Sequence, residues 1–506
     1  MSHPSSVSSV VTLPPAKVPA GVVARMAAVV GARHVIHEAA DLTTYEQDAL
    51  TSFRRRPGLV VLPASTEEVV EVMKVAREAG LPVVPRGAGT GLSGGALPTP
   101  GCVVVSLARM TAILEVDIEN GLLRAQPGVI NLDISRHLAP LGYYYAPDPS
   151  SQGVCTVGGN LAENSGGAHC LKYGFTTNHV RGARLVAAYA GTVEVIDLGG
   201  GVLDAPGYDL LGVLIGGEGT LGIVTEVVLR ILRKPEATRT FLAAFPSTAE
   251  AGGCVSEIIG CGIVPAAIEM MDRLAIEAAI RAVGVDWRIE SPRVGAVLLM
   301  DVDGPLSEVE HTSRQAVEIA ERTGAIYVRV PKDEEERALM WKGRKSAFAA
   351  MGRLAPNYIV QDGVIPRTEI ARVLGEIQAL ADAAGLRVAN VFHAGDGNLH
   401  PLVLYDARVA GQEAAAEALS AEILRLCIRA GGSITGEHGV GVDKALFMPE
   451  MFSEGDLDTM AKVRCAFDPD MLCNPGKIFP TPRLCGDRPG PYRPHPAERS
   501  GQADRG

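Results

Sequence analysis

Two histidine-containing motifs in the second half of the chain hold the residue types best suited to chemistry. The first, His393-Ala-Gly-Asp-Gly-Asn-Leu-His400, places two imidazoles on either side of a tight Gly-Asp-Gly turn, and Gly-Glu-His-Gly follows at 436–439. Imidazoles that flank a turn can face one point, and a carboxylate from elsewhere can complete the set. We therefore predict that His393, His400 and Glu437 bind a catalytic divalent metal, because three protein ligands leave coordination positions open. Zinc, manganese and iron all fit.

His438 stands next to the predicted ligand Glu437 and is a candidate general base. The alternative is that these are core or loop histidines with satisfied hydrogen bonds, but their clustering in two glycine-flanked motifs favours metal binding or catalysis. Asp396 is expected to form the turn rather than to orient a histidine. Arg344 and Lys345 lie on a predicted helix from Asp333, and Arg344 is the cation we predict for a substrate carboxylate. The competing interpretation is a solvated helix face.

A glycine-rich loop at 85–95, Pro-Arg-Gly-Ala-Gly-Thr-Gly-Leu-Ser-Gly-Gly, predicts an anion site. Bare backbone amides in such a loop can turn onto a pyrophosphate, with Arg86, Thr90 and Ser93 adding donors at the rim. A dinucleotide-binding fingerprint must open a helix, but here Pro98 and Pro100 follow, and no Gly-Lys-Ser/Thr is present for a Walker loop. A flexible surface loop is the alternative. A second glycine-rich stretch at 156–167 and a third at 216–222 favour the anion site.

Composition restricts the function. The chain has 506 residues, 47% of them hydrophobic, and a net charge of −11, which argues against nucleic acid or an acidic membrane as the main partner. Its 9 cysteines form no C-x-x-C pair, so the usual iron–sulfur and zinc-ribbon spacings are missing, and a cytosolic protein with reduced thiols is expected. The N-terminus does not read as a signal peptide, and no run of about 20 apolar residues predicts a membrane span.

The predicted elements indicate an α+β protein with four regions: a lead-in with one helix (1–50), a first domain (51–235), a second domain (236–480) and a disordered tail (481–506). The first domain is expected to contain strands at 59–63, 81–84, 102–107, 123–126 and 223–232, a helix that begins after Ser65 and ends at Gly80, and a hairpin of 185–189 with 192–196. The second is expected to contain two β-α-β units on an antiparallel sheet, from strands 240–245, 296–301 and 326–330 and helices 248–260 and 307–322. Helices at 333–350 and 414–429 follow. Asn474-Pro-Gly-Lys477 can return the chain to the first domain.

Taken in order, these motifs resemble the FAD-linked oxidases of the vanillyl-alcohol-oxidase (PCMH-type) superfamily, and within it the D-2-hydroxy-acid dehydrogenases. The resemblance runs from about 45 to 480 and is carried by PRGAGTGLSGGA, APDPSSQ, GGNLAENSGG, HCLKYG, GEGTLG, HAGDGNLH, GEHG and NPGK. It implies a PCMH-type FAD-binding domain of two α+β subdomains and an antiparallel-sheet cap domain with helices.

The resemblance also implies roles for individual residues. The FAD contacts would come from Arg86, Gly87, Gly89, Thr90, Gly91, Ser93, Asp148, Ser151, Thr156, Gly159, Asn160, Gly222, Val224 and Asn474. Covalent members of the superfamily have a histidine where Thr90 stands, so non-covalent FAD is expected. Relatives that act on 2-hydroxyglutarate have an asparagine where this chain has Leu402, which favours a small monocarboxylate.

The implied reaction is oxidation of a small D-2-hydroxy acid, glycolate to glyoxylate, with His438 as base and Arg344 on the carboxylate. D-Lactate oxidation at the same site is one alternative, and a flavin-binding subunit without its own chemistry is another. Electrons are expected to pass to a partner or a quinone. Because cluster cysteines are missing, the expected partners are a second flavin-binding subunit and an iron–sulfur subunit of a glycolate oxidase complex. The expected location is the cytoplasm, with at most peripheral contact with the inner membrane through those partners.

Overall fold

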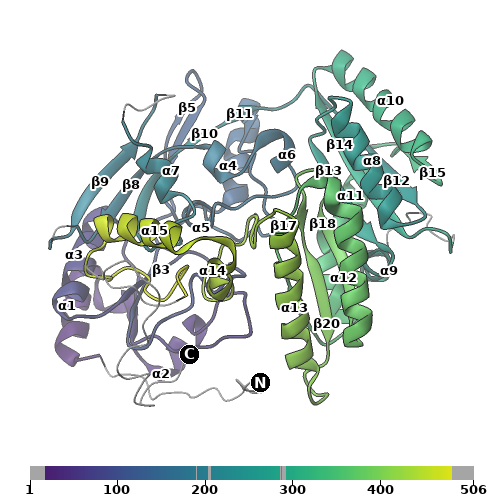
Figure 1. Ribbon diagram of the computed structural model, residues 1–506. Coiled ribbons are helices and arrows are strands. Elements are labelled where there is room, and N and C mark those ends of the chain that lie inside the picture. The colour runs from purple at the N-terminus through teal and green to yellow at the C-terminus, as the bar shows by residue number, and fades with distance from the viewer. Residues whose placement is uncertain (1–17, 190, 203–206, 285–286, 288–291, 481–506) are drawn as a thin grey trace.

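The computed structural model describes residues 18–189, 191–202, 207–284, 287 and 292–480. The tail predicted to be disordered, 481–506, lies outside these residues. Figure 1 shows two lobes, one built from the first half of the chain and one from residues after about 235, with the last described helix lying back across the first lobe.

The first lobe begins with a small sheet that carries the glycine-rich loop. Its strand order is β1-β2-β4-β3, in which β2, β4 and β3 are parallel and β1 is antiparallel to β2. The strands are β1 (Val35–Ile36), β2 (Leu59–Val61), β3 (Val83–Arg86) and β4 (Val103–Ser106), and the helices are α1 (Ala20–Val30), α2 (Ala39–Leu42) and α3 (Thr66–Glu78). Ser65 caps α3 by accepting from the Glu68 N–H. The chain after β3 forms no helix, as the two prolines predicted.

A second, antiparallel sheet completes the first lobe, with the order β5-β6-β10-β8-β9. Its strands are β5 (Ile113–Asp117), β6 (Leu122–Ala125), β8 (Val180–Ala187), β9 (Glu194–Gly199) and β10 (Ile223–Arg230), and α4 (Asn131–Leu138), α5 (Val157–Glu163), α6 (Cys170–Tyr173) and α7 (Leu210–Leu214) accompany it. The predicted hairpin is present, but β8 begins at Val180 rather than Leu185 and its ladder ends where Ala187 pairs with Glu194. The short strands β7 (Tyr143–Tyr144) and β11 (Leu232–Arg233) pair at the lobe boundary.

The second lobe is a nine-stranded sheet with helices on both faces. Two β-α-β units are present, but the first one closes on β13, which was not predicted, and not on β14: the units are β12–α8–β13 and β14–α10–β15, which interleave in the order β15-β12-β14-β13 as in ferredoxin-like folds. The elements are β12 (Ala237–Phe245), α8 (Thr248–Gly260), β13 (Ala267–Asp272), α9 (Arg273–Val283), β14 (Ala296–Gly304), α10 (Leu306–Arg322), β15 (Tyr327–Arg329), α11 (Glu334–Ala350), β16 (Asn357–Val360), β17 (Gly363–Val364), α12 (Ile370–Ala384), β18 (Arg387–His393), β19 (Asn398–Leu399), β20 (Pro401–Tyr405) and α13 (Gln412–Arg429).

Side chains that alternate along β12 show how the two faces are covered. Phe241, Ala243 and Phe245 join a core with α8, α10, α12 and α13, whereas Leu242 and Ala244 join a core with α9 and α11. The predicted α+β class is therefore confirmed, but strand β13 and helices α9 and α12 were missed. Because both faces are buried, the site residues at one end of this sheet rest on a rigid support.

The end of the described chain completes the first lobe. After α14 (Met448–Met451) and α15 (Glu454–Phe467), Cys473 forms a parallel bridge with Val83 of β3. The Asn474 Nδ2 donates to the carbonyl oxygens of Gly95 at 2.9 Å and Glu218 at 2.6 Å, and the Lys477 Nζ donates to Leu97 O at 2.6 Å. The C-terminal segment thus ties the glycine-rich loop to the loop before β10.

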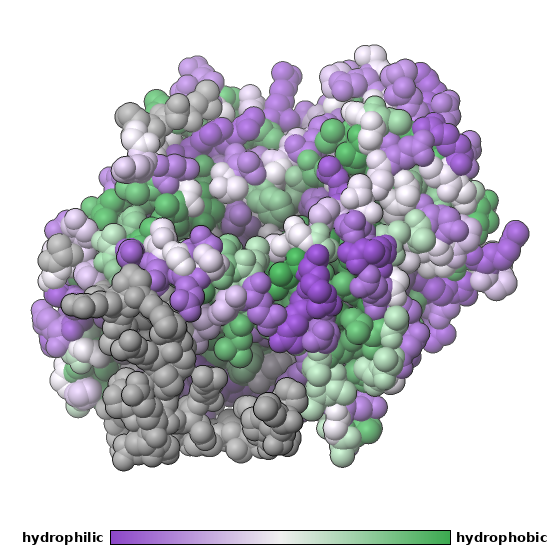
Figure 2. Space-filling model, viewed as in Figure 1, coloured by the Kyte–Doolittle hydropathy of each residue, from purple (hydrophilic) through white to green (hydrophobic). Residues whose placement is uncertain are grey.

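The surface of the viewed face mixes polar and apolar residues, and Figure 2 shows apolar side chains gathered over α7 and β9. Val195, Val202, Leu210 and Val213 are exposed there. No helix among the described residues has the length and apolar character needed to cross a membrane.

Candidate active site

The predicted metal ligands converge at one end of the second-lobe sheet. β18 ends at His393, the turn returns through β19, and His400 immediately precedes β20, so the centres of the two imidazole rings lie 5.2 Å apart. Glu437 arrives on a loop after α13, and its Oε1 lies 3.3 Å from His393 Nε2 and 3.2 Å from His400 Nε2. The structure therefore brings together the three residues that the sequence singled out.

The donor set fits a divalent cation. His400 is buried, and although its Nε2 lies 3.2 Å from Glu437 Oε1 and 3.4 Å from Asp362 Oδ1, neither of its ring nitrogens has the geometry of a hydrogen bond to any described residue. Ligand atoms of His393, His400 and Glu437 lie within 4.8 Å of one another, and those of Asp362, His400 and His438 meet the same limit. A buried imidazole without a hydrogen-bond partner, facing a carboxylate, is the environment that a metal ion would satisfy.

Glu269, which sequence analysis missed, orients the first histidine. It lies on β13, is fully buried, and its Oε1 is 2.7 Å from His393 Nδ1, so Nε2 is directed toward Glu437. Its other carboxylate oxygen forms an ion pair with Arg344 of α11. Arg344 is itself buried, and its Nε–H has no hydrogen-bond partner among the described residues. Arg344 therefore compensates the buried charge of Glu269 next to His393.

Asp362, also missed, organises the loop that carries Glu437 and His438. One carboxylate oxygen, Oδ2, accepts from Thr435 Oγ1 at 2.5 Å, from the His438 N–H at 2.9 Å and from Lys444 Nζ at 3.2 Å. The Gly436 and Glu437 N–H groups also donate to this side chain. A fully buried carboxylate with this many donors acts as the centre around which the loop folds.

His438 lies beside this centre. Its ring stacks on that of His400 with centroids 5.0 Å apart, and its Nδ1 is 3.9 Å from Asp362 Oδ2. Burial lowers the pKa of His438 to about 4, against an opposing effect of the Asp362 carboxylate.

The first lobe holds the far side of the same loop. Glu218, from the third glycine-rich stretch, accepts from the Val440 and Gly441 N–H groups, both at 2.7 Å. The Ser93 carbonyl accepts from Val442 and Asp443 N–H at 3.0 and 3.1 Å. The loop of His438 is thus clamped between the two lobes.

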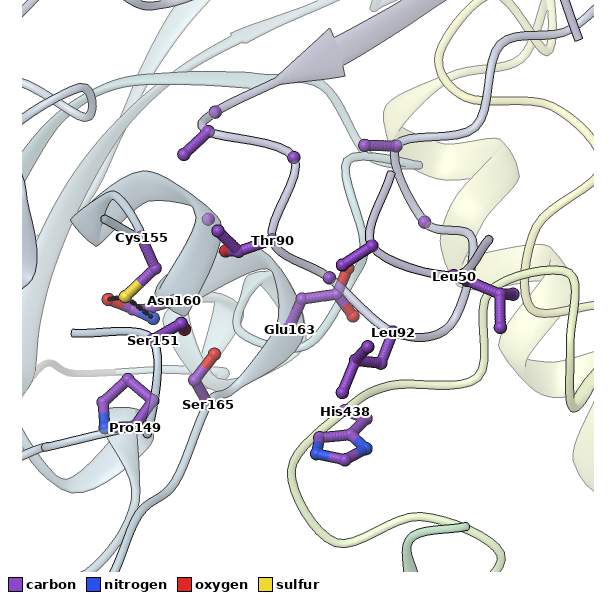
Figure 3. Close-up of a pocket in the computed structure, with 18 of the residues that line it drawn as sticks. Leu50, Thr90, Leu92, Pro149, Ser151, Cys155, Asn160, Glu163, Ser165 and His438 are labelled. Atoms are coloured by element: carbon purple, nitrogen blue, oxygen red, sulfur yellow. Dashed lines mark hydrogen bonds between the residues drawn. The ribbon is translucent and has the colours of Figure 1, made fainter. Parts of the chain in front are cut away.

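A cavity of about 670 Å³ lies between the lobes. Figure 3 shows Thr90, Ser151 and Asn160 of the first lobe around the same space as His438. The predicted site residues that line it are Arg86, Gly87, Gly89, Thr90, Gly91, Ser151, Thr156, Gly159, Asn160, Gly222, Val224, His400, Glu437 and His438. Lys345, Phe348 and Tyr358 close the second-lobe side.

Five predicted residues stand behind the cavity wall instead. Ser93 and Asn474 make the loop contacts described above, Asp148 accepts from His169, and Arg344 and His393 are held by Glu269. Glu163, which sequence analysis missed, does line the cavity. Burial and the neighbouring Glu218 carboxylate raise the pKa of Glu163 well above its usual range.

The cavity wall fits a flavin nucleotide. Gly89 has a φ of +71°, and a Cβ there would lie 2.2 Å from Arg86 Nη2, so only glycine lets the loop fold over its own arginine. At Gly87 a Cβ would lie 2.3 Å from Thr156 Oγ1, so the first two glycine-rich stretches meet with room only for backbone. Exposed amides over an elongated cavity suit a pyrophosphate and the groups on either side of it.

Fold and site together define a flavin-dependent oxidoreductase. The chain matches the family model "FAD linked oxidases, C-terminal domain" over residues 234–478 and "FAD binding domain" over 57–197, and it belongs to the FAD-linked oxidases. The predicted family is therefore confirmed.

Individual proteins are similar in sequence to most of this chain. The chain is 46% identical over 453 residues to "Glycolate oxidase subunit GlcD" of Escherichia coli (strain K12), covering 90% of each chain. It is 39% identical to the protein of that name in Bacillus subtilis (strain 168), over 86% of this chain and 92% of the relative. "D-lactate dehydrogenase" of Anaerostipes hadrus is 34% identical, over 84% of this chain and 90% of the relative.

Solved structures share the fold. A p-cresol methylhydroxylase with substrate bound superposes with a TM-score of 0.74 at 17% identity, covering 92% of this chain and 98% of that one. An alkyldihydroxyacetonephosphate synthase superposes with a TM-score of 0.72 at 18% identity, covering 92% of this chain and 87% of that one.

Proposed function

We propose that the protein oxidises glycolate to glyoxylate as the FAD-binding subunit of a larger enzyme. The observation that carries the proposal is the meeting, at one cavity, of the glycine-rich loops with His400, Glu437 and His438. The two GlcD relatives support the choice of substrate and, through the word "subunit" in their names, an assembly with partners.

Each side chain has a role in this proposal. His438 takes the proton of the substrate α-hydroxyl, and helix α11 supplies the positive charge for the substrate carboxylate, through Lys345 at the cavity wall and Arg344 behind it. When bound, FAD supplies the acceptor for the α-hydride, and a divalent metal held by His393, His400 and Glu437 supplies a Lewis acid for the hydroxyl. Loss of one proton and one hydride converts the 2-hydroxy acid into the 2-oxo acid.

The residue two positions after His400 supports a small substrate with one carboxylate. Leu402 stands on the same face of β20 as His400 and is buried among Ala389, Val391 and Leu404, so this position offers no amide to a second carboxylate. D-Lactate is the second candidate, favoured by the A. hadrus relative and by the apolar side chains of Phe348 and Val360 at the cavity.

Electron exit and location extend the proposal. We infer that the reduced enzyme passes electrons to a second flavin-binding subunit and an iron–sulfur subunit, and that any contact with the membrane is made through those partners. Assembly on co-expression with such subunits, followed by size-exclusion chromatography, tests this part separately.

Anaerobic bleaching of the bound flavin near 450 nm tests the reaction. Glycolate, D-lactate, L-lactate and D-2-hydroxyglutarate are mixed with the purified protein before and after a chelator. Fast bleaching by glycolate that the chelator abolishes and added metal restores supports the proposal, and the relative rates decide between glycolate and D-lactate. Bleaching that survives complete metal removal contradicts the metal role, and flavin that none of the four acids reduces contradicts an independent activity of this chain.

A further inference from the structure

A short segment of the first lobe, residues 166–174, reaches from the flavin cavity to the predicted metal ligands, and we name it the docking segment. It contains α6 and the sequence His-Cys-Leu-Lys-Tyr-Gly, to which the reaction above gives no role. It begins with the last two residues of the second glycine-rich stretch and ends before β8.

One end of the docking segment is bound to the flavin side. Asp148 accepts from the His169 N–H at 3.3 Å, and its second oxygen is 2.9 Å from His169 Nδ1. Asp148 immediately precedes Pro149, Ser150 and Ser151, which line the cavity. The His169 ring also stacks on Trp341 of α11, with the planes at 23°. The position of the cavity wall and the position of His169 are therefore fixed together.

The middle of the docking segment presses against the metal-ligand loops. A Cβ on Gly166 would lie 2.8 Å from Glu437 Oε2, and a Cβ on Gly395 would lie 2.7 Å from Leu171 Cδ2. Gly395 belongs to the turn that joins His393 to His400. Glycine at both positions lets the docking segment approach these loops closely, so a displacement of the segment acts on the Glu437 side chain or on the histidine turn.

The second lobe anchors the far end through Asp303 of β14. The Lys172 Nζ donates to the Asp303 backbone O and to Oδ1, both at 2.5 Å, and the Tyr173 hydroxyl donates to Oδ2 at 2.7 Å. The Asp303 side chain is only 7% exposed, so these bonds are shielded from water more than those of a surface ion pair.

We propose that the docking segment couples FAD binding to metal binding, so that each ligand tightens the other. Bound FAD holds the loop of Asp148 in place, and the docking segment, which is bonded to that loop, then holds Glu437 and the histidine turn in their ligand positions. A bound metal fixes the same residues and, through the docking segment, the FAD side of the cavity. Binding linkage requires the two effects to be equal. The inference rests on the proposed metal site and adds that flavin binding increases the affinity of this site for its metal.

The experiment measures FAD affinity with and without metal. Holoprotein treated with a chelator is divided, Mn²⁺ is added to one half, and the dissociation constant of FAD is read from the recovery of flavin fluorescence on dilution. Bound Mn²⁺ is counted by electron paramagnetic resonance. We expect Mn²⁺ to tighten FAD by at least about fivefold, within the usual range for coupled sites.

Variants decide whether the docking segment carries the effect. Lys172→Met removes the two hydrogen bonds that Lys172 makes to Asp303. We expect it to bring the ratio of the FAD dissociation constants without and with Mn²⁺ close to one. Leu171→Ala is an independent second variant. Lys74→Met, which removes an exposed lysine paired with Glu71, is the matched control and keeps the full ratio.

The outcomes separate the two proposals. Stoichiometric Mn²⁺ with an unchanged FAD affinity overturns the coupling and leaves the proposed reaction standing. If both docking variants keep the full effect of Mn²⁺ on FAD affinity, the role of the docking segment is overturned and the reaction again stands. No bound Mn²⁺ in the half that receives it overturns the metal site and the coupling together.

Discussion

At the scale of single residues, the site depends on buried carboxylates that hold other groups in place. Glu269 directs His393, and Asp362 gathers the loop of Glu437 and His438. Neither contacts the cavity, yet each determines where a side chain at the site points.

Replacing Asp362 by asparagine tests this role. Asp362→Asn keeps the shape but removes the charge that Lys444 and four loop donors share, so we expect metal affinity to fall by about 10- to 100-fold. Chelator competition with Mn²⁺ measures it. Asp382→Asn on the exposed face of α12 is the control and should bind metal normally; equal affinity in both variants would contradict an orienting role.

The His169–Asp148 pair predicts a pH dependence of stability. Burial lowers the pKa of His169, but Asp148 outweighs it and raises the pKa to about 9, with Asp301 adding to the rise and Lys345 opposing it. Burial raises the pKa of Asp148, but the charge and hydrogen bonds of His169 outweigh burial, so the net pKa of Asp148 is lowered from 3.8. The stabilisation is therefore complete below the unfolded histidine pKa of 6.5 and above that of the carboxyl, and is lost as pH rises through about 9.

Thermal unfolding of His169→Gln against the unmodified protein checks this. At pH 6 we expect a loss of about 1.5–3 kcal/mol, the usual value of a hydrogen bond to a charged group. The difference in unfolding free energy between the two proteins should decrease as pH rises and disappear above pH 9. A difference that does not depend on pH would mean that stacking on Trp341, and not charge, stabilises the fold here.

At the scale of elements, the sequence predicted those that repeat a simple pattern and missed those that contain a functional charge. The helix of Glu334–Ala350, with Asp333 as its cap, was predicted nearly residue for residue. Strand β13 was missed because Glu269 interrupts its apolar run, and that charge is tolerated only because Arg344 and His393, distant in the sequence, meet it there. Asp362 lies between short strands and no local motif marks it.

The C-terminal segment gives a prediction at the same scale. Asn474 has a φ of +41°, which asparagine tolerates, and its amide bridges Gly95 O and Glu218 O. Asn474→Asp keeps the shape but sets an acceptor against two carbonyls, so we expect a loss of about 1–3 kcal/mol of stability and weaker FAD binding. Urea unfolding and flavin fluorescence measure the two effects. Asn178→Asp is the control, because the exposed side-chain oxygen of Asn178 accepts from the Phe175 N–H and aspartate keeps that bond. An equal response of both variants would contradict a role for the bridge.

At the scale of the whole molecule, the cavity between the lobes predicts how the flavin is held. Thr90 lines the cavity at the position where the resemblance places the histidine of covalent relatives. Burial raises the pKa of Cys155, another residue of the cavity wall, so the thiol stays protonated, and it contacts the Asn160 amide. We expect acid precipitation to release all flavin into the supernatant. Fluorescence of a denaturing gel is the second readout, and a flavin band that migrates with the protein would contradict non-covalent binding.

The return of the chain to its own beginning has a consequence for biosynthesis. Asn474 and Gly95 are 379 positions apart in the sequence, yet the Asn474 side chain donates a hydrogen bond to Gly95, the last residue of the glycine-rich loop. While the chain is still being made, the first lobe has its sheets but lacks the segment that closes its glycine-rich loop, so an early-emerging domain cannot mature on the ribosome. Cofactor loading is thus deferred until translation is nearly finished, and a prematurely terminated product is expected to accumulate as a colourless chain that is a substrate for proteases.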